Sequence, residues 1–210
     1  TIVVMGASIS WGLKTGTPSA DRWSAKLQSL LRNHYGYTNI TVVNEAVGGF
    51  NSWEAATQMG IACFDRAPID LLIIGDYLYN DYGDADTHPT GVAEVADNYE
   101  RMFGLALRHG THSRSVAAFE VLYQNGGLHV EGTSAARNDA YEAACRTVAD
   151  NLGLLTADGY HAMQALGASY LLGNYYTVVD DPAHYNAAGH DLWADVVFDA
   201  TLGGGRPFNG

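Results

Sequence analysis

The feature of the sequence that most restricts its fold is a regular alternation between short apolar runs and longer amphipathic runs. Several of the short runs are apolar at nearly every position, which is typical of strands buried on both faces of a parallel sheet. A strand that faced water on one side would instead alternate apolar and polar residues. The predicted strands cover residues 1–5, 40–46, 69–75, 115–122 and 175–179.

Amphipathic segments fill the spaces between these strands. In the segment 19–36 the apolar residues, among them Trp23 and Leu27, recur near helical spacing, with Ser19 suited to cap the helix and Gly36 to end it. This alternation predicts an α/β fold, a three-layer α/β/α sandwich around a central parallel sheet of about five strands. The other predicted helices cover residues 52–64, 91–110, 133–153 and 186–202.

The charge of the chain argues against one class of partner. Its formal net charge is −12, from 23 acidic and 11 basic residues, and it has no long run of Lys or Arg. Because such a chain repels a phosphate backbone, we do not expect it to bind nucleic acid, and we interpret the acidity as a solvated surface. No apolar stretch approaches the roughly 20 residues that a membrane-spanning helix needs, so no membrane span is expected.

The length of 210 residues suits one domain, which we predict for residues 1–203, followed by a flexible tail over 204–210. The sequence begins with Thr1 and enters a strand at once, as a processed, secreted protein or a domain excised from a longer chain does. Cys63 and Cys145 lie far apart and are expected to be buried thiols, with a disulfide left open. Compartment and oligomeric state stay open as well.

Ser8 follows the first predicted strand directly, in the stretch GASIS. It is either an ordinary turn residue or a nucleophile held at the carboxyl edge of the sheet, where open α/β folds bind ligands. Near the other end of the sequence, Asp181 and His184 lie three residues apart, on what we expect to be a tight turn before a helix. That spacing lets the carboxylate orient the imidazole. Serine, histidine and aspartate together are the parts of a hydrolytic triad.

Two further loops offer hydrogen-bond donors at the same predicted edge. The stretch NEAVGGFNS carries Gly48 and Gly49, and the stretch IIGDYLYNDYG carries Asn80. A bare backbone N–H and an asparagine amide are donors of the kind an oxyanion hole needs. The alternatives are that the glycines allow close helix packing and that the asparagine stabilises a turn.

These four stretches, in this order and over nearly the whole chain, resemble the four sequence blocks of the SGNH (GDSL-type) hydrolase superfamily of esterases and lipases. The resemblance implies an SGNH-hydrolase, flavodoxin-like fold. It implies that Ser8 is the nucleophile, His184 the general base and Asp181 its partner. It also implies an oxyanion hole made by the N–H groups of Ser8 and Gly49, or of Gly48 in its place, and by the Asn80 amide.

The activity implied by the resemblance is that of a serine esterase that hydrolyses small acyl esters, acetyl groups on carbohydrate included, through an acyl-enzyme and without a metal or cofactor. Two positions depart from the family pattern. Ala7 stands where the family usually has Asp, and Leu78 where it usually has Gly. These departures keep one alternative open, a catalytically impaired module of the same fold that binds a glycan or a protein partner.

Aromatic residues beside the blocks are candidates for the walls of a substrate pocket: Trp11, Phe50, Tyr77 and Tyr79. Residues of this type are equally common as packing residues at sheet edges. A second histidine of the last block, His190, falls on the predicted terminal helix, where we expect it to pack or to cap rather than to react.

Overall fold

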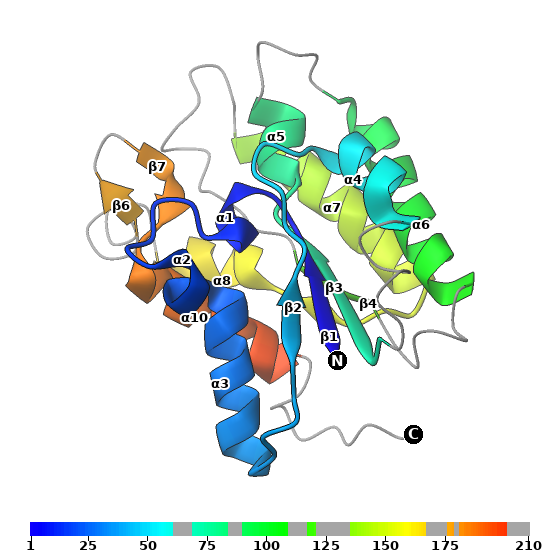
Figure 1. Ribbon diagram of the computed structural model, residues 1–210. Coiled ribbons are helices and arrows are strands. Elements are labelled where there is room, and N and C mark those ends of the chain that lie inside the picture. Colours follow the sequence, from blue (N-terminus) through cyan, green and yellow to red (C-terminus); the bar gives the residue numbers. More distant parts are fainter. Residues whose placement is uncertain are drawn as a thin grey trace.

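The computed structural model contains one parallel sheet of five strands with helices on both faces (Figure 1). The strands lie in the order β2-β1-β3-β4-β5, and each adjacent pair is parallel. This confirms the predicted α/β sandwich. The strands are β1 (Ile2–Met5), β2 (Val42–Asn44), β3 (Leu71–Gly75), β4 (Ala117–Glu120) and β5 (Thr156–Ala157). The structure describes residues 1–60, 69–83, 90–108, 117–120, 135–166, 176–178 and 181–200.

The two central strands are buried on both faces, which explains their continuous apolar sequences. In the register, Ile2 pairs with Leu71 and Val3 pairs with Leu72. Because side chains alternate across a strand, the two pairs belong to separate cores on opposite faces. One face is covered by α4 (Ser52–Met59), α6 (Val92–Arg108) and α7 (Ala135–Asn151), and the other by α3 (Trp23–Tyr35), α8 (Gly159–Leu166) and α10 (Ala187–Phe198).

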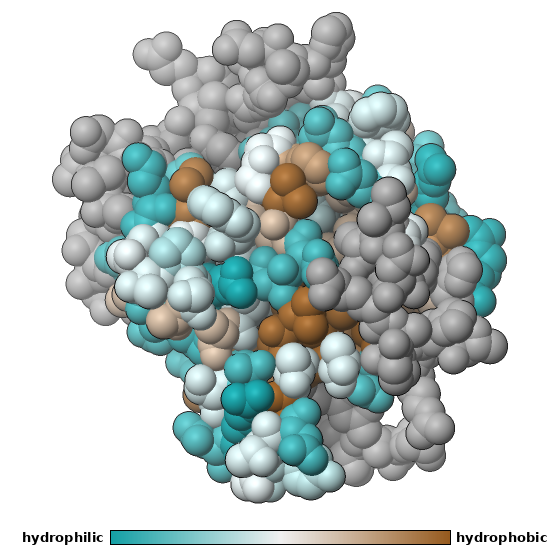
Figure 2. Space-filling view, viewed as in Figure 1, coloured by the Kyte–Doolittle hydropathy of each residue, from teal (hydrophilic) through white to brown (hydrophobic). Residues whose placement is uncertain are grey.

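The predicted helix over 19–36 is divided into α2 (Pro18–Asp21) and α3. Arg22 between them has an extended backbone, and Thr17 rather than Ser19 precedes α2. Gly36 ends α3 as predicted, with a left-handed φ of +62°. In Figure 2 the part of the molecule occupied by α3 is mostly hydrophilic, as expected for the outer face of a helix that packs on a sheet.

The strand predicted over 175–179 does not belong to the main sheet, which is a correction to the sequence analysis. Its described part, β6 (Tyr176–Val178), pairs antiparallel with β7 (Asp181–Tyr185) in a separate two-stranded sheet. The fifth place in the main sheet belongs to β5, which was not predicted. Asp181 and His184 therefore lie on a strand rather than on a tight turn, because residues 181–185 find a pairing partner in β6.

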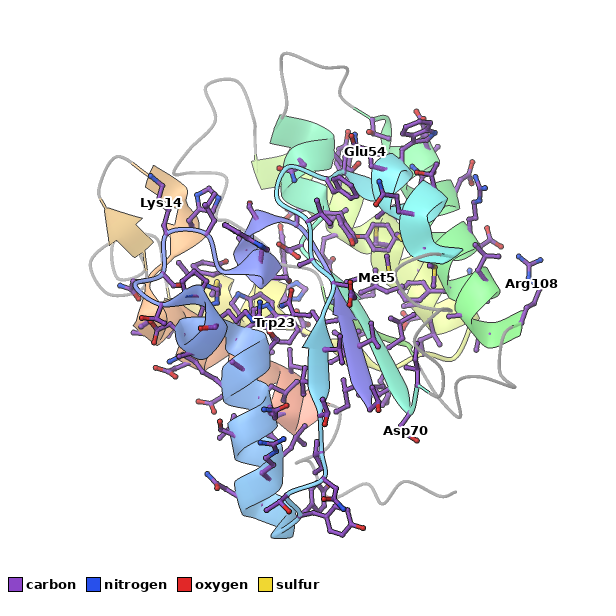
Figure 3. All side chains as sticks on the ribbon, in the orientation of Figure 1. Met5, Lys14, Trp23, Glu54, Asp70 and Arg108 are labelled. Carbon is purple, nitrogen blue, oxygen red and sulfur yellow. The ribbon has the colours of Figure 1, made fainter. Side chains whose placement is uncertain are left out.

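The order of the strands creates a switch point between β1 and β3. The chain passes from β1 to β2 on one side and then returns to place β3 on the other side. In open α/β sheets ligands bind beyond the carboxyl ends of the strands at such a point. Met5, labelled in Figure 3, ends β1 at this edge, and Asp70, labelled near the opposite edge, precedes β3. The residues that follow β1 and β3 are therefore neighbours in space.

The sequence also led to expectations about the two cysteines, the C-terminal tail and membrane spans. Cys145 is a free, buried thiol in α7, as predicted, whereas Cys63 and the tail over 204–210 lie outside the described residues. Within the described ranges, no helix combines the length and the apolar character that crossing a membrane requires.

The end of α3 gives a test of local backbone strain. We expect Gly36→Ala to lower the free energy of unfolding by about 1 kcal/mol, because an L-residue with a Cβ is strained at a left-handed φ. Among the described residues, no atom lies within 4 Å of a Cβ at this position, so crowding by them does not contribute. Urea unfolding measures the difference. Gly60→Ala is the matched control, since no described residue crowds Gly60 either but its φ is an ordinary helical −60°, and we expect no loss there.

Candidate active site

Ser8 is the first residue of α1 (Ser8–Trp11), a one-turn helix that begins two residues after β1. The Trp11 N–H donates to the Ala7 carbonyl at 2.9 Å, and Gly12 ends the turn with a left-handed φ of +90°. The chain thus makes a sharp change of direction at the carboxyl edge of the sheet. Ser8 is half-buried at this edge.

Asp76, the residue after β3, lies beside this turn and is only 1% exposed. Its Oδ1 accepts hydrogen bonds from the Ala7 N–H at 2.8 Å and the Ser10 hydroxyl at 2.6 Å, and its Oδ2 accepts from the N–H groups of Ile9 at 3.1 Å and Ser10 at 3.0 Å. Burial raises the pKa of Asp76 to about 6, although these hydrogen bonds lower it. Sequence reasoning missed this residue. The available signal was an acidic residue directly after a strand that is apolar throughout.

His184 reaches the turn from the other end of the sequence. Its Nε2 lies 3.0 Å from Ser8 Oγ, and the two residues are 176 positions apart. At this distance a neutral imidazole accepts a hydrogen bond from the hydroxyl. The side chain of Asp181 lies outside the described residues.

The glycine pair lies on the loop after β2, and Asn80 lies on the short helix that follows β3. A Cβ on Gly48 would lie 3.9 Å from the Ser8 Cβ, and Gly49 has a left-handed φ of +85°. The Asn80 amide nitrogen donates to the Phe50 carbonyl at 2.6 Å. Because that nitrogen carries two hydrogens, this bond uses one and leaves the second for another acceptor. The hydrogen bond also connects α5 (Leu78–Gly83) to the glycine loop.

Asp81 is a buried residue of α5 that connects this helix to the start of α4. Its buried Oδ1 accepts from the N–H of Ser52 at 3.1 Å and from its hydroxyl at 2.9 Å. The Asn98 amide of α6 donates to the same Ser52 hydroxyl at 3.0 Å. Burial raises the pKa of Asp81 to about 6. This network holds together the starts of α4 and α5 and the middle of α6.

A comparison with known families identifies the chain. Residues 4–192 match the model of the GDSL-like lipase/acylhydrolase family, and this range includes the first, second, third and last of the sequence blocks. The chain belongs to this family. It is a serine ester hydrolase, as the sequence resemblance implied.

Several solved structures share the fold of this hydrolase. TesA is 18% identical, with a TM-score of 0.76 and coverage of 96% of this chain and 98% of TesA. The acetyl xylan esterase AlAXEase is 14% identical, with a TM-score of 0.76 and coverage of 96% and 100%. Axe2, an acetylxylan esterase from Geobacillus stearothermophilus, is 18% identical, with a TM-score of 0.70 and coverage of 95% and 92%. No curated protein matches the chain in sequence.

The four aromatic residues suggested as pocket walls of the hydrolase have different positions. Trp11, at the end of α1, is 44% exposed. Phe50 is partly buried and packs against the core under α4 and α6, whereas Tyr77 is 1% exposed within that core. The structure therefore favours packing over substrate contact for Tyr77. The side chain of Tyr79 lies outside the described residues.

His190 of the hydrolase has a structural role, as its place on the predicted terminal helix indicated. It is fully buried on α10, and its Nδ1 accepts a hydrogen bond from the Trp23 N–H at 3.2 Å, at the first residue of α3. Trp23 is labelled in Figure 3 near the end of α3 that approaches the site. Burial, together with the charge of Lys26, lowers the pKa of His190 to about 4.

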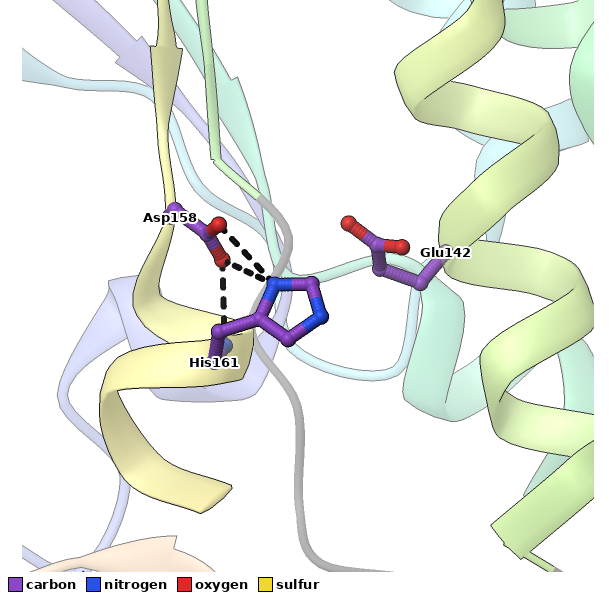
Figure 4. A group of neighbouring side chains, drawn as sticks. All are labelled: Glu142, Asp158 and His161. Atoms are coloured by element: carbon purple, nitrogen blue, oxygen red, sulfur yellow. Dashed lines mark hydrogen bonds and ion pairs between the residues drawn. The ribbon is translucent and has the colours of Figure 1, made fainter. Parts of the chain in front are cut away.

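Figure 4 shows one group of potential metal ligands, which come from α7, from the start of α8 and from the residue before α8. Single ligand atoms of Glu142, Asp158 and His161 lie within 4.8 Å of one another. However, the Arg146 guanidinium donates to Glu142 at 2.6 Å and lies 3.2 Å from Asp158, and His161 Nδ1 lies 2.9 Å from Asp158. The arrangement is an ion-pair network in which Arg146 already supplies the cation.

The buried histidine predicts a pH dependence of stability. In the folded chain His190 stays neutral down to about pH 4, whereas an unfolded histidine binds a proton below about pH 6.5. The unfolded state therefore binds more protons in this window, and stability falls as the pH drops through it. We expect the free energy of unfolding of the natural chain, measured relative to His190→Asn, to fall by about 2 kcal/mol between pH 7 and pH 5.

Urea unfolding of both proteins at each pH measures this difference. The control is His34→Asn, which changes an exposed histidine near the end of α3 and should show no comparable change with pH. A constant difference between the natural chain and His190→Asn would contradict the assignment of a neutral buried histidine.

Proposed function

We propose that this hydrolase is a serine esterase in which Ser8 is the nucleophile and His184 is its general base. The observation that carries the proposal is the 3.0 Å contact between Ser8 Oγ and His184 Nε2. As Ser8 Oγ attacks the ester carbonyl, His184 Nε2 takes the hydroxyl proton and then gives it to the leaving alcohol. Water attacks the resulting acyl-enzyme, again through His184, and releases the acid.

The third role goes to Asp181, on the resemblance of the last sequence block. As an ionised carboxylate it accepts a hydrogen bond from His184 Nδ1, fixes the tautomer and stabilises the imidazolium that forms. The N–H groups of Ser8 and Gly49 and the second hydrogen of the Asn80 amide bind the oxyanion. The bond from the Asn80 amide to the Phe50 carbonyl supports this arrangement, because it ties α5 to the glycine loop.

The substrate class that we propose is a small acyl ester, with acetyl groups on carbohydrate as the first candidate. Two of the solved structures of this fold are described as acetyl xylan esterases. In this chain, Trp11 lies one helical turn after Ser8 and is 44% exposed. An exposed indole next to the nucleophile offers a flat apolar face of the kind on which a sugar ring can stack.

The roles of the reacting residues can be tested with p-nitrophenyl acetate near pH 8, where an unperturbed histidine is neutral. We expect Ser8→Ala and His184→Ala each to lower kcat by about 10⁴-fold or more, and Asp181→Asn to lower it by at least about 100-fold. Circular dichroism shows whether each variant is folded. Turnover by Ser8→Ala at the natural rate would refute the esterase proposal. An unchanged Asp181→Asn would remove only the third role.

The substrate class can be tested separately by comparing p-nitrophenyl esters with an acetylated xylo-oligosaccharide. We expect kcat/KM to fall at least about tenfold from the acetate to the octanoate ester. Trp11→Ala should raise KM for the oligosaccharide about tenfold and leave ethyl acetate, an ester without a ring, within about threefold, because only the sugar can stack on the indole. Tyr37→Ala, an exposed aromatic just beyond the far end of α3, is the control. Equal effects of Trp11→Ala on both substrates would exclude a sugar-stacking role.

A further inference from the structure

The end of β3 carries a buried carboxylate that the proposed reaction does not use. Asp76 receives four hydrogen bonds, and all four come from residues 7–10, the turn that holds the nucleophile. Three of these bonds come from backbone N–H groups at the start of α1, which has no side-chain cap of its own from Ala7. Such N–H groups have no partner within their own helix. Asp76 therefore caps α1 from a neighbouring strand.

The pattern of these bonds is selective. Asp76 accepts from the N–H groups of Ala7, Ile9 and Ser10 but not from that of Ser8. Within the described part of the chain, the Ser8 N–H has no hydrogen-bond acceptor. Fixing the donors on either side of Ser8 thus leaves one N–H of the turn for the oxyanion.

We propose that Asp76 is a positioning residue, whose carboxylate holds the turn 7–10 so that the Ser8 N–H is presented to the oxyanion of the reacting ester. This inference rests on the proposed esterase function. Ala7 has no carboxylate of its own, and the carboxylate at this turn comes from Asp76 after β3. Asp76 acts through Ser8 and makes no contact with substrate.

The packing around Asp76 leaves its carboxylate little freedom to move. A Cβ on Gly6 would lie 2.1 Å from Asp76 Oδ1 and 2.3 Å from Ser10 Oγ, so only glycine allows this approach. Asp76 itself has a left-handed φ of +51°, a conformation that costs a non-glycine residue energy and persists only where its surroundings enforce it. This strain is consistent with a residue held for its side-chain position.

Two further side chains stabilise the arrangement from α3 and β2. The Trp23 indole N–H donates to Ser10 Oγ at 3.1 Å, and the Asn44 amide donates to the Ser10 carbonyl at 2.7 Å. Ser10 therefore connects Asp76 to both neighbouring elements. Because Asp76, Ser10 and Trp23 are buried and the groups are hydrogen-bonded to one another, a change at Asp76 alters the backbone of the turn and not only one contact.

The test is Asp76→Asn, which is nearly isosteric but turns one acceptor oxygen into an NH₂ donor that faces N–H groups. With p-nitrophenyl acetate we expect kcat to fall about 100-fold or more, the loss typical of one oxyanion donor, with KM within about threefold. Leu31→Ala is the matched control, because it removes buried side-chain volume from α3, outside the proposed site. It should lower Tm and leave kcat within about threefold.

The kcat values of these two variants distinguish a positioning role of Asp76 from a purely structural one. If Asp76→Asn keeps its kcat, or if Leu31→Ala loses as much kcat for the same fall in Tm, Asp76 has only a structural role and the inference is wrong. Should Asp76→Asn fail to fold, Ser10→Ala serves in its place, since it removes one of the four bonds. We then expect kcat to fall about three- to tenfold with KM unchanged, and an unaltered kcat overturns the inference. Loss of turnover in Ser8→Ala, together with a normal Asp76→Asn, leaves the esterase proposal intact.

Discussion

The N–H groups of the chain that leaves β1 need acceptors, and this requirement organises the centre of the molecule. Buried backbone donors are almost always hydrogen-bonded, because an unpaired one costs free energy. β1 lies between β2 and β3 and is covered on both faces, so water does not supply the acceptors where it ends. Asp76 from the end of β3 does so instead. The first turn of α1 depends on this contact between neighbouring strands.

This solution has an energetic cost, because a carboxylate must be buried. Burial raises the pKa of both Asp76 and Asp81 to about 6, so the folded chain holds protons that the unfolded chain releases above about pH 4. Stability therefore falls as the pH rises through this window and the two groups ionise. The two carboxylates, one at the Ser8 turn and one beside Asn80, oppose folding at neutral pH while they order the loops. Functional sites often show this compromise between stability and activity.

The large-scale features of the fold could be predicted from the sequence alone. Continuous apolar runs predicted β1 and β3, helical periodicity predicted the major helices, and the sequence blocks predicted that Ser8 and His184 meet. The sequence was insufficient where distant contacts decide local structure. The break between α2 and α3 at Arg22 coincides with the bond from Trp23 to His190, 167 residues away. β5 has only two residues, too few for a periodicity signal, and the position of Asp76 depends on strand order, which periodicity does not give.

The distance along the chain between Ser8 and His184 has a consequence for how this protein matures. The serine is carried by the first strand and helical turn, whereas the histidine precedes the last described helix, α10. Contacts of such long sequence separation form late, since much of the chain must first be ordered between them. A nascent or partly folded chain thus holds Ser8 apart from His184, the residue that we propose as its general base. Ester cleavage becomes available only with the closing contacts of the native state, which makes turnover a direct report of complete folding.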